Sequence, residues 1–498
     1  MFCHRVLKAA PAIAAIAALA SCSPDGDGLI DVAVIESTDR LSVDGMRLSY
    51  GQQLVRGATS EGLVTLNADG ETVPALAERW IVTDEGRSFI FRLREANWAD
   101  GSPVDAQSVR AEMLRQITAL EGTSLGLDLA LIDEIRAMTS RVIEIRLSRP
   151  MPSFLLLLSQ PEFGLRRGKE GTGPMHVSEV GDGVLLTPMP PETRGLPEEQ
   201  DFADRTRTLR LAAMPAQQAI DAFNDGGVDL VVGGTLASLP LAETGPLSRG
   251  NLRLDSAQGL FGLRVTNARD FLEMAERREA LSMAIDRSAL LNPFNLSGWP
   301  STTRLVPVTL MAEALGPDAD SAPQERWSDM PLEARRSRAA RRVADWESAS
   351  GSEASVSIFL PEGPGSDRLF QRLATEFASI GVGSIRAADR AAADLVLVDR
   401  LARYTAPRWF LGQFHCGIVR GTCIEEADAL VKLALGSEEG LAKPVHLVEA
   451  ETLLIETNTY IPLGAPVRWS LVRGGLDGFT ENRWASHPLL PLAVDPIF

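Results

Sequence analysis

"ETVPALAERWIVTDEGRSFIFRLREANWADGSPVDAQSVRAEMLRQITAL" (residues 71–120) holds a strand pattern and a helix pattern with a turn between them. Large apolar side chains occupy alternate positions along residues 88–93, which predicts a strand. Asp100-Gly101 is typical of a turn, and Asp105 is a candidate N-cap. The residues that predict one buried helical face then recur every four positions: Val109, Met113 and Ile117.

Short apolar runs and amphipathic helical patterns alternate along the rest of the chain. Residues 29–35 predict a buried first strand, and residues 273–291 predict a helix. Residues 207–233 and 355–399 each predict a strand, a helix and a second strand, an order that favours parallel or mixed sheets. The length of 498 residues exceeds what one hydrophobic core usually spans. The sequence therefore predicts an α/β protein with at least two sheets and two or three domains.

The first residues have the pattern of an export signal. Arg5 and Lys8 precede an apolar run over residues 9–20, which is shorter than the roughly 20 residues that cross a bilayer. The run ends in Leu19-Ala20-Ser21-Cys22, which resembles the bacterial lipobox, whose cysteine is lipidated after cleavage. We expect a signal peptide over residues 1–21, lipidation at Cys22 and a flexible tether over residues 22–28. The alternative is an ordinary cleavage site with a cysteine nearby.

The net charge and the distribution of apolar residues indicate which partners and which location to expect. The formal net charge is −17, and removing the signal peptide takes away two positive charges, which leaves about −19. This balance argues against nucleic acid as a partner. No later run approaches a membrane span, so we expect a monomer held to a membrane by its lipid, in the periplasm or cell envelope.

Two of the four cysteines stand close together late in the chain. Cys416 and Cys423 lie in "HCGIVRGTC" (residues 415–423), and a disulfide between them suits an oxidising compartment. The alternative is a metal pair with His415, although Cys-x6-Cys is not a standard zinc spacing. We predict the disulfide, no metal site and no cofactor.

Enzyme motifs are weak in this chain. Residues 122–126 satisfy Gly-x-Ser-x-Gly, but a nucleophile elbow needs a strand before the serine, whereas a predicted helix ends near Leu120. The histidines that follow the signal peptide are scattered, and no His-Glu-x-x-His pair occurs among them. We therefore expect that the protein is not an enzyme.

Motifs of one protein family recur in order along almost the whole chain. Residues 71–109 carry Pro-Ala-Leu-Ala-Glu before a tryptophan, a Phe-x-Leu-Arg strand and Trp-x-Asp-Gly-x-Pro-Val. "GTGPMHV" (171–177), "GGVDLV" (226–231), "RREALSMAIDRSAL" (277–290) and "YIPL" (460–463) follow. The chain resembles the extracellular solute-binding proteins of family 5, the oligopeptide, dipeptide and nickel class that serves ABC importers.

This resemblance implies a fold that periodicity alone does not give. It implies the two-lobed periplasmic-binding-protein fold of type II, in its large variant with an extra domain. The first lobe would be discontinuous, built from residues 29–48, 165–262 and 470–498. The extra domain would span residues 49–164, and the second lobe residues 263–469.

The same resemblance places a candidate ligand site in "DRLARYTAP" (residues 399–407). Peptide-binding members carry Gly-Trp-x-Ala-Asp-Tyr-x-x-Pro here, and their aspartate pairs with the ammonium group of the peptide. This chain has Asp399 and Arg400 at the Gly-Trp positions and Arg403 at the acidic position. A guanidinium repels an ammonium and binds carboxylate or phosphate through two parallel hydrogen bonds.

We therefore expect Arg403 to bind an anionic group of the solute, with Tyr404 and Trp409 as stacking surface and Asp399 and Arg400 close by. The alternative is that Arg403 pairs with an internal acid such as Asp399. At the level of function, the first hypothesis is a receptor that delivers a small solute, peptide-like or anionic, to the permease of an ABC importer. The second is a binding-fold lipoprotein that has left transport and works as a sensor or envelope interaction protein. A nickel- or haem-binding variant is a lesser alternative that rests on His415.

Overall fold

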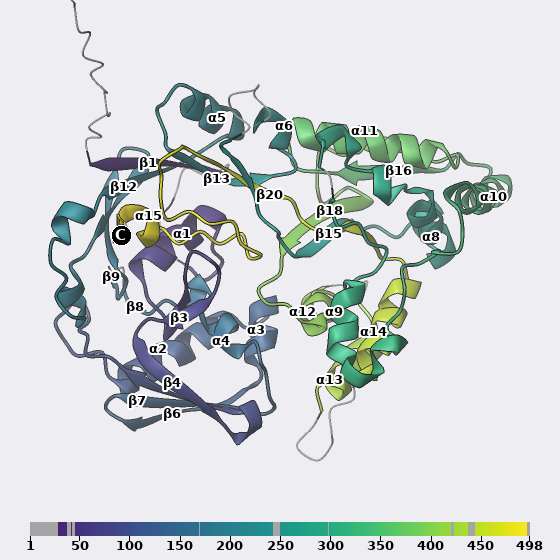
Figure 1. The fold of residues 1–498 in the computed structure, drawn as a ribbon. Helices are drawn as coiled ribbons and strands as arrows, with labels where there is room; N and C mark the ends of the chain where they lie inside the picture. The colour runs from purple at the N-terminus through teal and green to yellow at the C-terminus, as the bar shows by residue number, and fades with distance from the viewer. Residues whose placement is uncertain are drawn as a thin grey trace, which may run out of the picture.

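The computed structural model describes residues 28–36, 41, 45–168, 170–242, 250–296, 298–419, 423–436 and 444–495. Two bodies lie side by side in Figure 1, one coloured purple to teal and one teal to yellow, and the C-terminal segment returns to the first body. The predicted signal peptide, Cys22 and the tether up to residue 27 lie outside the described residues. In the part of the chain that is described, no helix combines the length and the apolarity needed to cross a membrane.

The first lobe is built on a seven-stranded sheet with the spatial order β10-β11-β12-β1-β13-β20-β14. The strands span Met175–Val180 (β10), Gly183–Pro188 (β11), Thr208–Met214 (β12), Leu29–Ile35 (β1), Leu230–Thr235 (β13), Arg468–Val472 (β20) and Leu252–Leu254 (β14). The predicted unit of residues 207–233 is confirmed as β12, helix α5 (Ala216–Asn224) and β13. Strand β1 separates its two strands and pairs in parallel with both.

The extra domain contains a four-stranded antiparallel sheet with the order β4-β5-β7-β6. Its strands span Ala77–Thr83 (β4), Ser88–Leu93 (β5), Ile132–Thr139 (β6) and Val142–Leu147 (β7). Helix α2 (Ala106–Ala119) begins as predicted, because the Asp105 carboxylate accepts a hydrogen bond from the Ser108 N–H at 2.8 Å. The short helices α3 (Ser124–Leu129) and α4 (Phe154–Leu158), the hairpin of β2 (Val64–Leu66) and β3 (Thr72–Pro74), and the two-residue strands β8 (Arg166–Arg167) and β9 (Glu170–Gly171) complete this region.

The second lobe has a five-stranded mixed sheet with the order β17-β16-β18-β15-β19. Its strands span Gly383–Arg386 (β17), Ser355–Phe359 (β16), Leu395–Leu401 (β18), Gly259–Val265 (β15) and Tyr460–Gly464 (β19). The predicted unit of residues 355–399 is confirmed as β16, α11 and β18. The helices are α8 (Ala275–Ala284), α9 (Val308–Leu315), α10 (Leu332–Ser350), α11 (Pro364–Ala378), α12 (Pro407–Gly412), α13 (Glu425–Ala434) and α14 (Val445–Glu456).

The helix predicted over residues 273–291 is shorter in the structure. Helix α8 ends at Ala284, and Ile285 has extended backbone with ψ of 124°. The Asp286 carboxylate accepts a hydrogen bond from the Ala289 N–H and thereby caps a separate 3-10 turn, Arg287–Ala289. A capping side chain inside an apolar pattern ended the helix, and apolar periodicity alone could not show this.

The order of the strands shows where the chain crosses from one lobe to the other. The chain leaves the first sheet after β14 and enters the second at β15, and it returns between β19 and β20. We propose to place the domain boundaries in residues 255–258 and 465–467, since the boundaries predicted at 262/263 and 469/470 fall inside strands. Helix α1 (Tyr50–Thr59), which the sequence division assigns to the extra domain, packs with Leu54, Val55 and Ala58 into the core of the first lobe.

Candidate functional site

A cavity of about 910 Å³ lies between the lobes. The residues before and within α1 form one wall, together with the turn Pro161–Phe163 that follows α4. The end of β18, the residues after it and Trp409 of α12 form the opposite wall. Together the two walls carry acidic, basic and histidine side chains. They are Glu36, Arg47, Glu162, Asp255, Asp399, Arg400, Arg403, Arg468 and His487. We call this cavity the cleft.

Arg403 reaches across the cleft to a carboxylate on the other side. Its guanidinium nitrogen lies 3.4 Å from Oε1 of Glu162, and the side chains are 27% and 5% exposed, respectively. Strand β18 brings Arg403 to one wall, and the turn Pro161–Phe163 brings Glu162 to the other. The alternative, that Arg403 pairs with an internal acid, therefore holds with Glu162 as the acid. Asp399, the acid named as an example, faces a different arginine.

That arginine is Arg468, whose Nη1 lies 2.8 Å from Oδ1 of Asp399. Burial raises the pKa of the Asp399 carboxyl, and the charge of Arg468 opposes this shift. Asp399 comes from the second lobe and Arg468 from the returning strand β20 of the first. The pair therefore links β18 of the second lobe to β20 of the first, and the Asp399 carboxylate faces Arg468.

Arg400 has a neutral partner. Its guanidinium donates a hydrogen bond to Oε1 of Gln413, and no carboxylate of the described residues lies within ion-pair distance of it. Arg400 is solvent-exposed in the cleft wall. Partial removal from water lowers its pKa, and the positive charge of Arg403 lowers it further. Arg400 and Arg403 therefore both face the cleft from one wall. The Glu162 carboxylate faces Arg403 from the opposite wall.

The two aromatic residues predicted to stack on the ligand have different positions. Tyr404 is 1% exposed and does not line the cleft; its hydroxyl donates a 2.6 Å hydrogen bond to Oδ1 of Asp128 in α3. Burial raises the pKa of Tyr404, and the charge of Asp128 raises it further. Trp409 does line the cleft and packs edge to face on Phe410. Trp409 touches the cleft but is itself only 2% exposed, so it offers a ligand little stacking surface. Tyr404 offers none and holds the second lobe against the extra domain.

Several cleft residues were not among the sequence predictions. Glu162 had no local signal, because nothing in its surroundings in the sequence points toward a residue 241 positions later. Tyr50 begins α1, and burial raises its pKa. Ser49 and Gln52 form a capping box at this helix start, which the sequence pattern could have shown. The Glu36 carboxylate accepts hydrogen bonds from the Ser49 hydroxyl and the Gly51 N–H, both at 3.0 Å.

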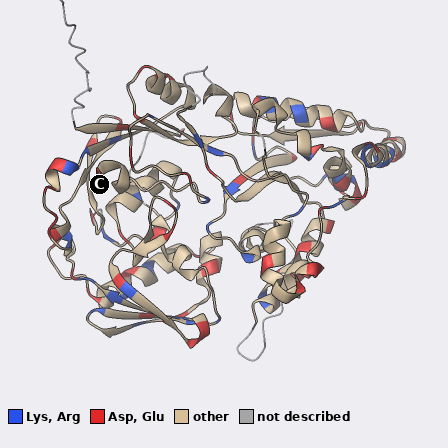
Figure 2. Ribbon diagram, viewed as in Figure 1, with Lys and Arg blue, Asp and Glu red and all other residues tan. Residues whose placement is uncertain are grey.

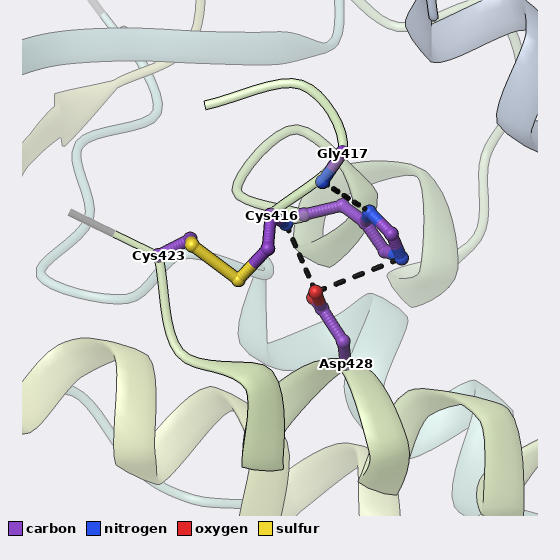
Figure 3. The surroundings of a disulfide bond; sticks show 5 residues. Cys416, Gly417, Cys423 and Asp428 are labelled. Carbon is purple, nitrogen blue, oxygen red and sulfur yellow. Dashed lines mark hydrogen bonds and ion pairs between the residues drawn. A yellow bond between two sulfur atoms is a disulfide. The ribbon is translucent and has the colours of Figure 1, made fainter. Parts of the chain in front are cut away.

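The cysteine pair lies beside this site. The sulfur atoms of Cys416 and Cys423 are joined in a disulfide, with the Cα atoms 5.0 Å apart (Figure 3). The Asp428 carboxylate accepts a hydrogen bond from the Cys416 N–H at 2.9 Å, and Nε2 of His415 lies 3.6 Å from it. Sulfurs bonded to each other cannot bind a metal as thiolates, and no group of three potential ligands gathers among the described residues.

Helix α2 precedes the Gly-x-Ser-x-Gly match, as predicted, in place of the strand that a nucleophile elbow needs. Gly122 and Thr123 connect the helices, and the Thr123 hydroxyl accepts a hydrogen bond from the Gly126 N–H as the N-cap of α3. Ser124–Gly126 form the first turn of α3, where a loop was expected. Figure 2 shows acidic and basic residues interspersed over both lobes, so the net negative charge is not gathered on one part of the face in view.

Sequence and structure comparisons place the chain among known proteins. Residues 71–180 match the family model of bacterial extracellular solute-binding proteins, family 5. The probable deoxycholate-binding periplasmic protein YgiS of Escherichia coli is 30% identical over 20% of this chain and 22% of its own length. The periplasmic oligopeptide-binding protein OppA of Salmonella typhimurium is 24% identical over 61% of this chain and 62% of its own length. The matches thus span from about a fifth to about three fifths of these relatives.

Solved structures extend the likeness of fold to nearly the whole chain. Haemophilus influenzae OppA, in complex with the peptide RPPGFSPFR, has a TM-score of 0.77 at 14% identity and covers 93% of this chain and 98% of its own. The murein tripeptide-binding protein MppA of Escherichia coli has a TM-score of 0.77 at 17% identity and covers 94% and 99%. These are type II periplasmic binding proteins, which confirms the predicted fold, and the family and its fold neighbours are solute-binding proteins and not enzymes. Residues 71–180 of the chain thus match the bacterial extracellular solute-binding proteins, family 5, and the fold is that of the type II periplasmic binding proteins.

Proposed function

We propose that the protein is the solute-binding component of an ABC importer and captures a small solute with an anionic group in the cleft. Relatives are named for dipeptides, oligopeptides, a murein peptide, nickel and deoxycholate. One structure with the same fold, AgaA, holds agropinic acid. Because such different solutes occur among the relatives, the residues of the cleft have to decide the solute class for this chain.

The pair of guanidiniums on the second-lobe wall is the observation that carries the proposal. Arg400 and Arg403 both line the cleft, and the carboxylate nearest to Arg403 is 3.4 Å away. A charge-assisted hydrogen bond of good geometry is shorter, about 2.7–2.9 Å. A ligand carboxylate between the two arginines would gain short bonds and relieve their mutual repulsion.

Glu162 gives the cleft a second, opposite charge. Its carboxylate is nearly inaccessible to bulk solvent, and it stands on the wall across from Arg403. A solute that carried both a carboxylate and an ammonium could exchange the internal pair for two ligand pairs. This arrangement supports a peptide-like or purely anionic solute. The charge at position 403 is positive, whereas peptide-binding members of the family carry an acid at this position of the motif.

The setting in the cell follows from the beginning of the sequence. We propose that a lipid on Cys22 and the tether of residues 22–28 hold the mature protein, as a monomer, to a membrane of the cell envelope. Several relatives are named as periplasmic proteins, which supports this location. A tether of a few flexible residues would let the lobes reach the permease subunits.

The solute class is tested by comparing matched ligands. Native mass spectrometry of the purified protein identifies a retained solute, and calorimetric titration compares that solute with its carboxamide and its N-acetyl derivative. We expect the carboxamide to bind at least about tenfold more weakly, because it lacks the charge that pairs with Arg400 and Arg403. If the carboxamide binds as tightly as the solute and the N-acetyl derivative does not bind, the site recognises an ammonium group, and the proposal is contradicted.

The anchor is tested separately. Replacement of Cys22 by serine in the producing bacterium should move the protein from the membrane fraction to the soluble periplasmic fraction, while a Cys3→Ser variant stays with the membrane. Equal fractionation of the two variants would contradict lipidation at Cys22.

A further inference from the structure

A second cavity, of about 400 Å³, lies between the extra domain and the second lobe. One side comes from α3 and the residue that follows β7 by two positions, and the other from α12 and α13. Trp409 and Ser124 line both this cavity and the cleft. Its volume falls within the roughly 300–1,000 Å³ of small-molecule sites. We call it the side cavity.

Cations from both sides converge on the side cavity. They are Arg149 after β7, Arg408 of α12 and Lys432 of α13. Arg408 is engaged, since its guanidinium donates to the Leu127 carbonyl at 3.1 Å and lies 3.6 Å from Oδ1 of Asp128. Arg149 donates only to a backbone carbonyl, that of Lys432, at 3.2 Å. No carboxylate of the described residues lies within ion-pair distance of Arg149 or Lys432.

The Arg149 side chain has unused hydrogen-bonding capacity. Its Nε is buried and has no hydrogen-bond partner in the described structure. An unsatisfied buried donor is unfavourable, and more so on a charged group. Arg149 and Arg408 line the same cavity from two domains, and burial and the positive charge of Arg408 both lower the pKa of Arg149.

The acids around the side cavity are already occupied. Asp128 accepts the Tyr404 hydroxyl at 2.6 Å and faces Arg408. Asp428 accepts the Cys416 N–H at 2.9 Å and lies 3.6 Å from His415. The side chains left to meet a ligand therefore combine the three cations with the polar Ser124, Gln413 and His415 and with apolar side chains. The apolar members are Leu127, Ala130, Leu131, Trp409, Ala429, Val431 and Leu435.

We propose that the side cavity is a second binding site, separate from the solute cleft, for a small amphipathic carboxylate. The carboxylate group would lie between the guanidiniums of Arg149 and Arg408, where it would separate the two positive charges. The apolar body would lie against Leu131, Trp409 and Leu435. Because the walls belong to two domains, the bound molecule would also link the extra domain to the second lobe.

The test uses the full mature chain with decanoate as the probe and decan-1-ol as its neutral counterpart. We expect calorimetry to show one decanoate per protein, and at least about tenfold weaker binding of the alcohol. Arg149→Met should weaken decanoate by a similar factor. Arg338→Met makes the same chemical change on the exposed face of α10 and should have no effect.

Two further variants separate this site from the cleft and from a loss of folding. Ala429 is exposed on α13, so Ala429→Phe fills the side cavity without disturbing a core, and it should also weaken decanoate. Circular dichroism verifies that each variant is folded. The proposal is overturned if decanoate and decan-1-ol bind equally, or if Arg400→Met abolishes binding while Arg149→Met and Ala429→Phe leave it unchanged.

Discussion

Two glutamates that each face an arginine show how differently the molecule uses such pairs. Glu451 of α14 lies inside the second lobe with 0% of its side chain exposed. It accepts hydrogen bonds from Arg304 at 2.8 Å and from the N–H groups of Leu305 and Val306 at 3.0 and 3.1 Å. Glu162 faces the cleft, and its ion pair is a 3.4 Å contact with Arg403.

The difference separates a structural pair from an exchangeable one. A buried carboxylate is stable only when its oxygens are well satisfied, and Glu451 meets this condition through three donors within one lobe. The Arg403 and Glu162 contact joins the two walls of the cleft. Its poor geometry leaves little interaction energy to lose, so a ligand can replace either partner. We expect variants of the first pair to change stability and variants of the second to change binding.

The largest effect is expected from Glu451→Ala. Arg304 would remain buried without its counter-charge, which costs about 3–5 kcal/mol of unfolding free energy. Urea unfolding measures this loss. Glu449→Ala, on an exposed position of the same helix, is the matched control and should stay within about 0.5 kcal/mol. A variant as stable as the control would show that the buried pair does not stabilise the lobe.

Arg403→Glu should have the next largest effect, on affinity. It places a second carboxylate opposite Glu162, so binding of the retained solute should weaken at least about a hundredfold. The unfolding midpoint should also fall, because Glu162 is only 5% exposed and would lose its counter-charge. Arg338→Glu makes the same charge reversal on exposed α10 and serves as the control in the same titration. Unchanged affinity in Arg403→Glu would remove the anionic-solute proposal.

Sequence alone predicted the elements whose cause is local. The strand Ser88–Leu93 and the start of α2 depend on side-chain alternation and on the Asp105 cap, which lie within a few residues of each other. The end of α8 at Ala284 was missed, because a competing cap at Asp286 overrides apolar periodicity. The placement of β1 between β12 and β13 depends on pairings across the whole lobe, which no local pattern contains.

The sequence led to residues that line the cleft, and it did not give the directions of their side chains. The family motif led to residues 399–409, and Arg400, Arg403 and Trp409 do line the cleft. It gave no information on side-chain direction, so Tyr404 was expected to face a ligand, although it is bonded to Asp128. Glu162 lies 241 residues from Arg403, and only the fold brings them together.

Glu162→Gln sharpens the comparison with a smaller effect. The amide keeps the shape of the side chain and removes the charge that competes for Arg403, so an anionic solute should bind about threefold to tenfold more tightly. Calorimetry of the same solute measures the gain, with Glu449→Gln as the control. Weaker binding would instead show that Glu162 pairs with a cationic group of the solute, as a peptide-like ligand requires.

The smallest effect concerns the pH dependence of the contact between Asp128 and Tyr404. Burial raises the pKa of Asp128 above its usual 3.8, so the folded protein holds this proton more tightly than the unfolded chain. The stability of the wild type relative to Asp128→Asn should therefore fall as pH rises from about 3.8 through the raised pKa. Hydrogen bonds from Ser102 lower the pKa of the exposed Asp100, so the difference between the wild type and Asp100→Asn should instead fall as pH decreases below 3.8. Urea unfolding between pH 3 and pH 7 measures both differences, because most carboxyls titrate in this range. Slopes of the same sign would show that Asp128 is not set apart by its burial at the domain contact.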